Sequence, residues 1–293
     1  MHGAARDTVL VGEDASGTFA LRPETGSPSS GYIVFANGIG QGLIPYNTFH
    51  SVLGALPAFI HEQPKDTLVI GLGSAGTLFG VVGRPSAERV VCVEIVGAQL
   101  PTLELLHAWR PGLGLAAVLT DPRITQVYGD GRTYVARSGR KFDIIEADAL
   151  RPTCSYSGHL YSTEYFDLLR RHLRPGGLAV TWVPTDRTHR SFVKVFPYVV
   201  RLGQIALGSN EPIRVDPDAV RERLKDAKVQ RHFASAGLGM AALLAPYVDR
   251  PAVTFGPEFD RSTLTDLNTD LFPRDEFSGV RNLGASVMRV FSR

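Results

Sequence analysis

The sequence predicts an α/β protein in which a parallel sheet carries helices on both faces and a small β domain precedes it. Three observations support this prediction. From Asp66 onward, apolar runs alternate with helical segments, which is typical of a parallel sheet with crossover helices. The first of these runs, DTLVIGL, leads into a glycine-rich turn, GLGSAG. Before that point, short β-prone runs are separated by clusters of Gly, Ser, Pro and Asp.

The N-terminal part is expected to form a small unit of its own. Its runs TVLVGED, GTFALRPE and GYIVFANG predict a small antiparallel sheet or a pair of hairpins. Residues 38–61 then carry apolar side chains at helical spacing, so we expect a helix there that bridges to the main domain. We therefore divide the chain into residues 1–60, the N-terminal β-hairpin domain and bridge, and residues 61–293, the larger α/β domain.

The larger domain is expected to contain five parallel strands, over residues 67–72, 89–95, 124–129, 142–148 and 178–183. Helices are expected near residues 98–109, 132–137 and 162–173, the last with Ser162 as its N-cap. Beyond the fifth strand we expect a helix over 191–201, an apolar run over 204–207, helices over 218–228 and a closing strand, ASVMRVF.

The glycine-rich turn and the acid that ends the next strand predict a nucleoside site. Gly71 and Gly73 permit a tight turn that brings the backbone close to a ligand. Glu94 ends the run RVVCVEI, where a carboxylate can accept hydrogen bonds from ribose hydroxyls. The alternative is a glycine-rich turn that serves only helix packing.

Two further acids follow expected strands. Ligands bind beyond the carboxyl ends of the strands in an open parallel sheet, so residues at these ends are candidates. Asp130, followed by Gly131, is placed to accept a hydrogen bond from an adenine amino group, and Asp148 ends the fourth strand. A nicotinamide dehydrogenase does not need an acid at position 130, so Asp130 favours an S-adenosyl compound over a dinucleotide. The alternative is that Asp130 only caps the following helix.

Composition excludes several classes of partner. The net charge is only +2, with no basic patch or acidic tail, so we expect no nucleic-acid partner. Two cysteines, Cys92 and Cys154, form neither a metal set nor a disulfide framework, which favours a reducing cytoplasm and no metal. No run approaches the roughly 20 apolar residues that span a bilayer, and the N-terminus lacks the apolar core of a signal peptide. We expect a cytoplasmic protein without membrane contact.

Several motifs resemble those of the spermidine synthase (polyamine aminopropyltransferase) family. They are NGIGQ, DTLVIGLGSAGT, VVCVEI, DPRITQVYGDGRTYV, FDIIEADALRP, SGHLYSTEYFDLLRRHLRPGGLAVTW and the late NTDLFP. The resemblance implies a small N-terminal β domain on a Rossmann-like domain of the class I methyltransferase type. It also implies decarboxylated S-adenosylmethionine as donor and a homodimer.

The resemblance assigns roles to individual residues. Gln41, Glu94 and Asp130 match nucleoside-binding positions. Asp148 matches the acid beside the reacting amine, which orients or deprotonates that nucleophile. The complete expected cofactor site consists of Gln41, Gly71, Gly73, Ser74, Gly76, Glu94, Asp130, Gly131 and Asp148.

Three departures from the family pattern bear on the substrates. Ser74 stands where the family's glycine turn carries an acid, Arg151 replaces the acid three residues after Asp148, and the tyrosine-histidine-glutamate motif reads Phe49-His50-Ser51. The family acids hold ammonium groups, and a charge pair at about 4 Å near a surface is worth roughly 4 kcal/mol. An arginine that faces the site would suit a carboxylate, whereas one that points to solvent would not affect binding.

The loop over residues 153–161, TCSYSGHLY, is expected to be the gate of the site because it follows the catalytic strand. Tyr156 and His159 are the catalytic candidates beside Asp148, since either side chain can orient or deprotonate an acceptor. The expected substrate-binding residues are His50, Arg151, Tyr161 and Trp182.

Together these features predict a transferase that binds S-adenosylmethionine or its decarboxylated form. We expect a methyl, aminopropyl or aminocarboxypropyl group to move to a small-molecule acceptor other than a simple diamine, leaving S-adenosylhomocysteine or 5′-methylthioadenosine. Two alternatives stay open: a genuine polyamine aminopropyltransferase, and a non-catalytic nucleoside-binding homologue.

Overall fold

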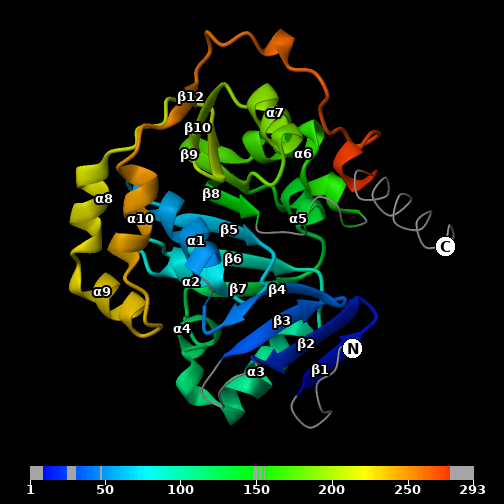
Figure 1. Cartoon of the computed structure of the whole chain (residues 1–293), viewed down its shortest axis with the longest axis vertical. Helices are drawn as coiled ribbons and strands as arrows, with labels where there is room; N and C mark the ends of the chain where they lie inside the picture. Colours follow the sequence, from blue (N-terminus) through cyan, green and yellow to red (C-terminus); the bar gives the residue numbers. More distant parts are fainter. Residues whose placement is uncertain are drawn as a thin grey trace, which may run out of the picture.

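The computed structural model describes residues 9–24, 31–46, 48–147, 151, 154 and 156–277 (Figure 1). Within these ranges no helix is both long enough and apolar enough to span a bilayer. The expected closing strand, ASVMRVF, lies outside the described residues.

The N-terminal sheet is an antiparallel meander of four strands, β1 (Leu10–Asp14), β2 (Gly17–Pro23), β3 (Tyr32–Ala36) and β4 (Ile39–Ile44). The expected small antiparallel sheet is therefore confirmed. The expectation that residues 38–44 are helical is wrong, because residues 39–44 form a strand that pairs with β3. The pairing contains an irregularity: Gly42 lies opposite Val34 and Gly40 opposite Phe35, so Gln41 is the extra residue of a β-bulge.

The helix α1 begins only at Thr48 and ends at Ile60, and it is buried from Ser51 onward. It packs closely on α2 (Gly76–Val82) because glycines lie at the crossing. A Cβ on Gly54 would collide with the carbonyl oxygen of Thr77, and one on Gly80 with that of Ser51. Residues 48–60 therefore form a helix of the apolar core. The boundary at residue 60 stays a prediction.

Over the part of the chain that the structure describes, the large sheet has eight strands in the order β12-β10-β11-β9-β8-β5-β6-β7. The five expected parallel strands are present as β5 (Asp66–Ile70), β6 (Arg89–Glu94), β7 (Ile124–Tyr128), β8 (Phe142–Ala147) and β9 (Leu173–Trp182). The sheet is mixed rather than parallel throughout, because β10 (Tyr198–Leu202), β11 (Ile205–Ser209) and β12 (Val253–Phe255) pair antiparallel. The helix expected over 191–201 ends at Val195 for this reason.

Helices cover both faces of this sheet, as predicted (Figure 1). One apolar core contains side chains of α1, α2, α3 (Gln99–Trp109), α4 (Ala116–Leu119), α8 (Pro217–Leu224), α9 (Ala227–Ala234) and α10 (Met240–Val248). The other contains side chains of α5 (Gly131–Ser138), α6 (Thr163–Arg171) and α7 (Asp186–Val195). This arrangement is the Rossmann-like fold that the sequence predicts.

A buried ion cluster fixes the amino ends of the central strands. Asp66, whose side chain is 1% exposed, pairs with Arg89 of β6 and with Arg174 of β9. Its backbone N–H donates to Asp143 Oδ2 of β8 at 2.8 Å. Because these contacts tie four neighbouring strands together at one edge, the opposite, carboxyl edge is held in register for a binding site.

Candidate active site

The glycine turn joins β5 to α2 at the carboxyl edge of the sheet. Gly71 and Gly73 have φ angles of 97° and 51°, in the region that favours glycine, and Ala75 adopts 64° as the N-cap of α2. A Cβ on Gly73 would meet no atom within 4 Å, so this turn borders open space. The carbonyl oxygen of Gly73 accepts a hydrogen bond from Gln99 Nε2, whose residue is 1% exposed. The turn is therefore fixed by a hydrogen bond on the side of Gln99 and borders open space at the Cα of Gly73.

Glu94 lies at the end of β6, beside this turn. Its Oε2 accepts a hydrogen bond from Leu72 N at 2.7 Å, and its Oε1 accepts one from Val96 N at 2.8 Å. Burial raises the pKa of this carboxyl, and the backbone hydrogen bonds oppose that rise. The backbone amides around the turn thus hold the carboxylate in one orientation at the end of β6.

The strand β4 of the N-terminal sheet passes directly over the glycine turn. A Cβ on Gly42 would lie 2.7 Å from Ser74 Oγ, and one on Gly76 would lie 2.9 Å from His50 Cβ. The structure thus brings together Ser74, Gly76 and His50 next to Gln41, the bulge residue of β4. Bulges re-aim side chains and are frequent beside active sites, which fits the expected role of Gln41.

Asp130 follows β7 and is exposed at the N-terminus of α5. Its Oδ1 accepts a hydrogen bond from Thr133 N at 2.7 Å, so it caps the helix as the alternative interpretation holds. No described residue donates to its Oδ2, which is free for a ligand amino group. Gly131 is buried, and a Cβ at this position would collide with Ile70 of β5. Glycine here therefore allows α5 to pack closely on the sheet.

The strand β8 ends at Ala147, and Asp148 lies outside the described residues. The last residue of β8, Ala147, pairs with Thr181 of β9. The next residue, Trp182, contacts Phe49 of α1 edge to face, with ring centroids 6.5 Å apart. Phe49 also lies edge to face with His50. Phe49 and Trp182 therefore form an aromatic pair at the carboxyl end of β9, and Phe49 was not among the predicted site residues.

The residues of the expected gate fall into two groups. Arg151, Tyr156 and His159 are exposed, and Tyr156 is 79% exposed with a φ of 66°. Tyr161, in contrast, is 2% exposed and belongs to an apolar core, and its expected contact with the acceptor stays a prediction. Its burial turns the preceding short helix Ser157–Leu160 against the body of the protein.

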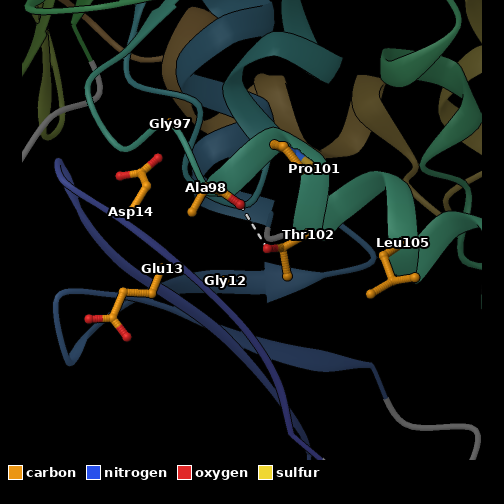
Figure 2. A pocket seen from close by; sticks show the side chains of 8 residues that line it. All are labelled: Gly12, Glu13, Asp14, Gly97, Ala98, Pro101, Thr102 and Leu105. Atoms are coloured by element: carbon orange, nitrogen blue, oxygen red, sulfur yellow. Dashed lines mark hydrogen bonds between the residues drawn. The ribbon is translucent and has the colours of Figure 1, made fainter.

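A hollow lies between β1 of the N-terminal sheet and α3 (Figure 2). Its lining residues are Gly12, Glu13, Asp14, Gly97, Ala98, Pro101, Thr102 and Leu105. A Cβ on Gly12 would collide with Thr102 Oγ1, so β1 packs directly on α3 here. None of the expected site residues lines this hollow. Among the described residues there is also no group of three or more His, Cys, Asp or Glu side chains placed to hold a metal ion.

The comparisons with known proteins agree with this geometry. Residues 47–187 match the family model described as "Spermine/spermidine synthase domain". Over this segment the chain carries a domain of the spermine/spermidine synthase type. The resemblance read from its motifs is thereby confirmed, and so is the expectation of a transferase family.

Two curated relatives of this spermidine-synthase-like chain show the extent of the similarity. Polyamine aminopropyltransferase from Thermotoga maritima is 27% identical over 216 residues, which is 65% of this chain and 71% of the relative. The enzyme of the same name from Nitrosomonas europaea is 27% identical over 253 residues, or 78% of this chain and 75% of the relative.

Solved structures extend the similarity to the fold. A spermidine synthase in complex with the transition state analogue AdoDATO superposes with a TM-score of 0.62 at 25% identity, covering 82% of this chain and 88% of that one. The spermidine synthase from Thermotoga maritima superposes with a TM-score of 0.60 at 24% identity over the same shares. The Rossmann-like fold of the class I methyltransferase type with an N-terminal β domain is confirmed.

Proposed function

We propose that this protein is an aminopropyltransferase that uses decarboxylated S-adenosylmethionine and a polyamine-type amine. The observation that carries the proposal is the glycine turn with Glu94, set in a chain whose relatives are polyamine aminopropyltransferases. The sequence alone favoured an acceptor other than a simple diamine. The relatives give that preference no support, and they favour the alternative, polyamine aminopropyl transfer.

The residues at the turn suit a nucleoside donor. Open space in front of Gly73 admits a ligand close to the backbone, the carboxylate of Glu94 is oriented by two backbone amides, and Asp130 Oδ2 is available to an amino group. We assign Gln41, Ser74, Gly76 and Glu94 to the sugar and side chain of the donor, and Asp130 to its base. The bound donor supplies a sulfonium centre, whose adjacent carbon is electrophilic.

The acceptor amine must lose its proton before it can act as a nucleophile. We assign this task to Asp148, the next residue after β8 in the sequence, with Tyr156 and His159 as further candidates. The aromatic pair Phe49 and Trp182 offers a wall for the methylene chain of the acceptor. Arg151 is exposed, which fits the interpretation that it points to solvent.

A product assay tests the proposal. The purified protein is incubated with decarboxylated S-adenosylmethionine and putrescine, and spermidine and 5′-methylthioadenosine are quantified by mass spectrometry. We expect both products in equal amounts, and we expect Asp148→Asn to reduce turnover by a factor of about 100 or more. If no amine acceptor, from diamines to longer polyamines, gives product while the donor binds, aminopropyl transfer is wrong and a non-catalytic nucleoside-binding role replaces it.

Calorimetric titration then separates the possible donors. We expect the decarboxylated compound to bind more tightly than S-adenosylmethionine itself. The opposite order would show that Ser74 and Arg151 have redirected the site to a carboxylate, and methyl or aminocarboxypropyl transfer would become the working function. A homodimer in the cytoplasm also stays a proposal, and light scattering on the purified protein measures the oligomeric state.

A further inference from the structure

A C-terminal segment, residues 266–276, lies across the loop that was expected to gate the site. In Figure 1 it is the orange to red stretch that passes beside α7 and α6 and ends near α5. At α7 it is held by Arg187, which pairs with Asp266 and Asp275, and by Arg190, which pairs with Asp266. Asn268, which is fully buried, donates from Nδ2 to Asp275 Oδ2 at 2.8 Å. The segment is thus a fixed part of the fold.

The same segment holds the short helix Ser157–Leu160 of the gate. Gly158 donates its N–H to Glu276 Oε1 at 2.5 Å. A Cβ on Gly158 would collide with Pro273, so glycine is required for the close approach. The gate therefore rests on residues more than a hundred positions later in the chain.

Arg132 joins this assembly to the nucleoside side of the site. Its guanidinium makes a two-pronged ion pair with Asp270, with Nη1 and Nη2 at 2.7 and 2.5 Å from Oδ1 and Oδ2. Nη1 also donates to the carbonyl oxygen of His159 at 2.9 Å. Arg132 stands in the first turn of α5, two residues after Asp130. One side chain therefore contacts the gate and the C-terminal segment from the helix that Asp130 caps.

Asp270 fixes the orientation of this arginine. Besides Arg132, it accepts a hydrogen bond from Ser162 Oγ at 2.6 Å, and its N–H donates to Glu164 Oε2 at 3.1 Å, so it is tied to the first turn of α6. The hydrogen bonds from Arg132 lower the pKa of Asp270, which keeps the carboxylate charged. Arginine suits this position because its planar fork engages two oxygens and a carbonyl at once, which a lysine cannot do.

We propose that Arg132, oriented by Asp270, is a positioning residue that sets the short helix Ser157–Leu160, and with it the acceptor, relative to the adenine side of the site. The role rests on the proposed aminopropyl transfer. Arg132 acts through the carbonyl of His159 rather than by touching substrate. Small displacements of reacting groups cost large factors in rate, so loss of this contact acts on the acceptor and leaves the donor in place.

The test compares Arg132→Gln, Arg132→Lys and Asp270→Asn with Arg221→Gln, which removes an exposed ion pair to Asp249 between α8 and α10. We expect kcat/KM for the acceptor to fall about tenfold or more in Arg132→Gln and Asp270→Asn, with donor affinity unchanged within about twofold. Arg132→Lys should recover only part of the loss, and the double variant should be no worse than Arg132→Gln alone. Arg221→Gln should leave both parameters unchanged.

Hydrogen exchange at the amides of residues 157–161 provides a readout that does not need activity. Faster exchange there in Arg132→Gln, with unchanged exchange in β5 and β6, supports the proposal. Equal losses of donor affinity and acceptor kcat/KM, or unchanged exchange in the gate, would overturn it. A wild-type protein without aminopropyl transfer would refute the proposed function, while the exchange experiment would still decide whether Arg132 positions the gate.

Discussion

Leu72 and Glu94 are joined across the glycine turn by a hydrogen bond of 2.7 Å from the backbone N–H of Leu72 to Oε2 of Glu94. The contact connects the end of β6 to the glycine turn that follows the neighbouring strand β5. It orients the carboxylate before any ligand arrives, so that less ordering is needed on binding.

Replacement of Glu94 should therefore weaken donor binding. In Glu94→Gln the amide can accept from only one of Leu72 N and Val96 N, and its NH₂ group then faces the other donor. Since a hydrogen bond to a charged group is worth about 1.5–3 kcal/mol, we expect donor affinity to fall by a factor of about 10 to 100. Calorimetry measures the change, and Glu88→Gln, at an exposed pair with Lys65, is the control. Unchanged affinity in Glu94→Gln would remove Glu94 from the site.

Gly42→Ala should disturb the glycine turn through Ser74. The added Cβ would lie 2.7 Å from Ser74 Oγ and 3.1 Å from its Cβ, closer than side chains tolerate, so the turn must shift. We expect donor affinity to fall about tenfold while the protein remains folded. Gly40→Ala is the matched control on the same strand, because its Cβ would meet nothing closer than Phe35 at 3.8 Å. Equal effects of both variants would contradict the contact between β4 and the turn.

Asp66→Asn should destabilise the fold without affecting the site directly. The buried carboxylate is paired with Arg89 and Arg174, and hydrogen bonds from Arg89 lower its pKa below the ordinary 3.8. Because these arginines reach solvent, we expect a loss of about 2–3 kcal/mol in the free energy of unfolding. A depressed pKa means that this stability is present above pH 3.8 and is lost as the pH falls through the folded-state value. Urea denaturation at pH 7 measures it, and a change below 0.5 kcal/mol, roughly that of a surface substitution, would contradict the assignment.

His189 should make the fold sensitive to mild acid. Burial lowers the pKa of this imidazole to about 4, and Arg201 and Arg190 add to the effect while Asp186 opposes it. The unfolded chain, with an ordinary pKa near 6.5, then binds more protons, so stability falls as the pH drops from about 6.5 towards 4. Melting temperatures of His189→Gln should fall less steeply over this range than those of the wild type. The exposed His159→Gln is the control, and parallel curves for His189→Gln and the wild type would refute the prediction.

The central part of the fold was predictable because local signals agree with the final packing. Local sequence patterns predicted three consecutive features without information on distant contacts: the strand β5, the turn at Gly71 and Gly73, and Glu94 at the end of β6. The capping role of Asp130 was also foreseen as an alternative. These features depend on strand length, positive φ and helix capping, all of which are encoded within a few residues.

The wrong predictions concern segments whose structure depends on distant partners. Residues 39–44 form a strand because β3 lies beside them, although their glycines weaken any local preference. The helix α7 ends at Val195 and β10 begins directly after Pro197. Because proline disrupts a helix interior, Pro197 indicated a helix end, but the helix was predicted from the apolar spacing alone. The part played by Arg132 could not be read from the sequence either, since its partner Asp270 lies 138 residues away.

That separation has a consequence for the order in which the molecule is completed during synthesis. The sheet, the glycine turn and Glu94 are all translated before the chain reaches Asp270, so the nucleoside side can fold while the ribosome is still adding residues. The gate obtains its two supports, Asp270 through Arg132 and Glu276 through Gly158, only near the end of the described chain. A nascent chain therefore completes the glycine turn before the short helix Ser157–Leu160 gains these supports.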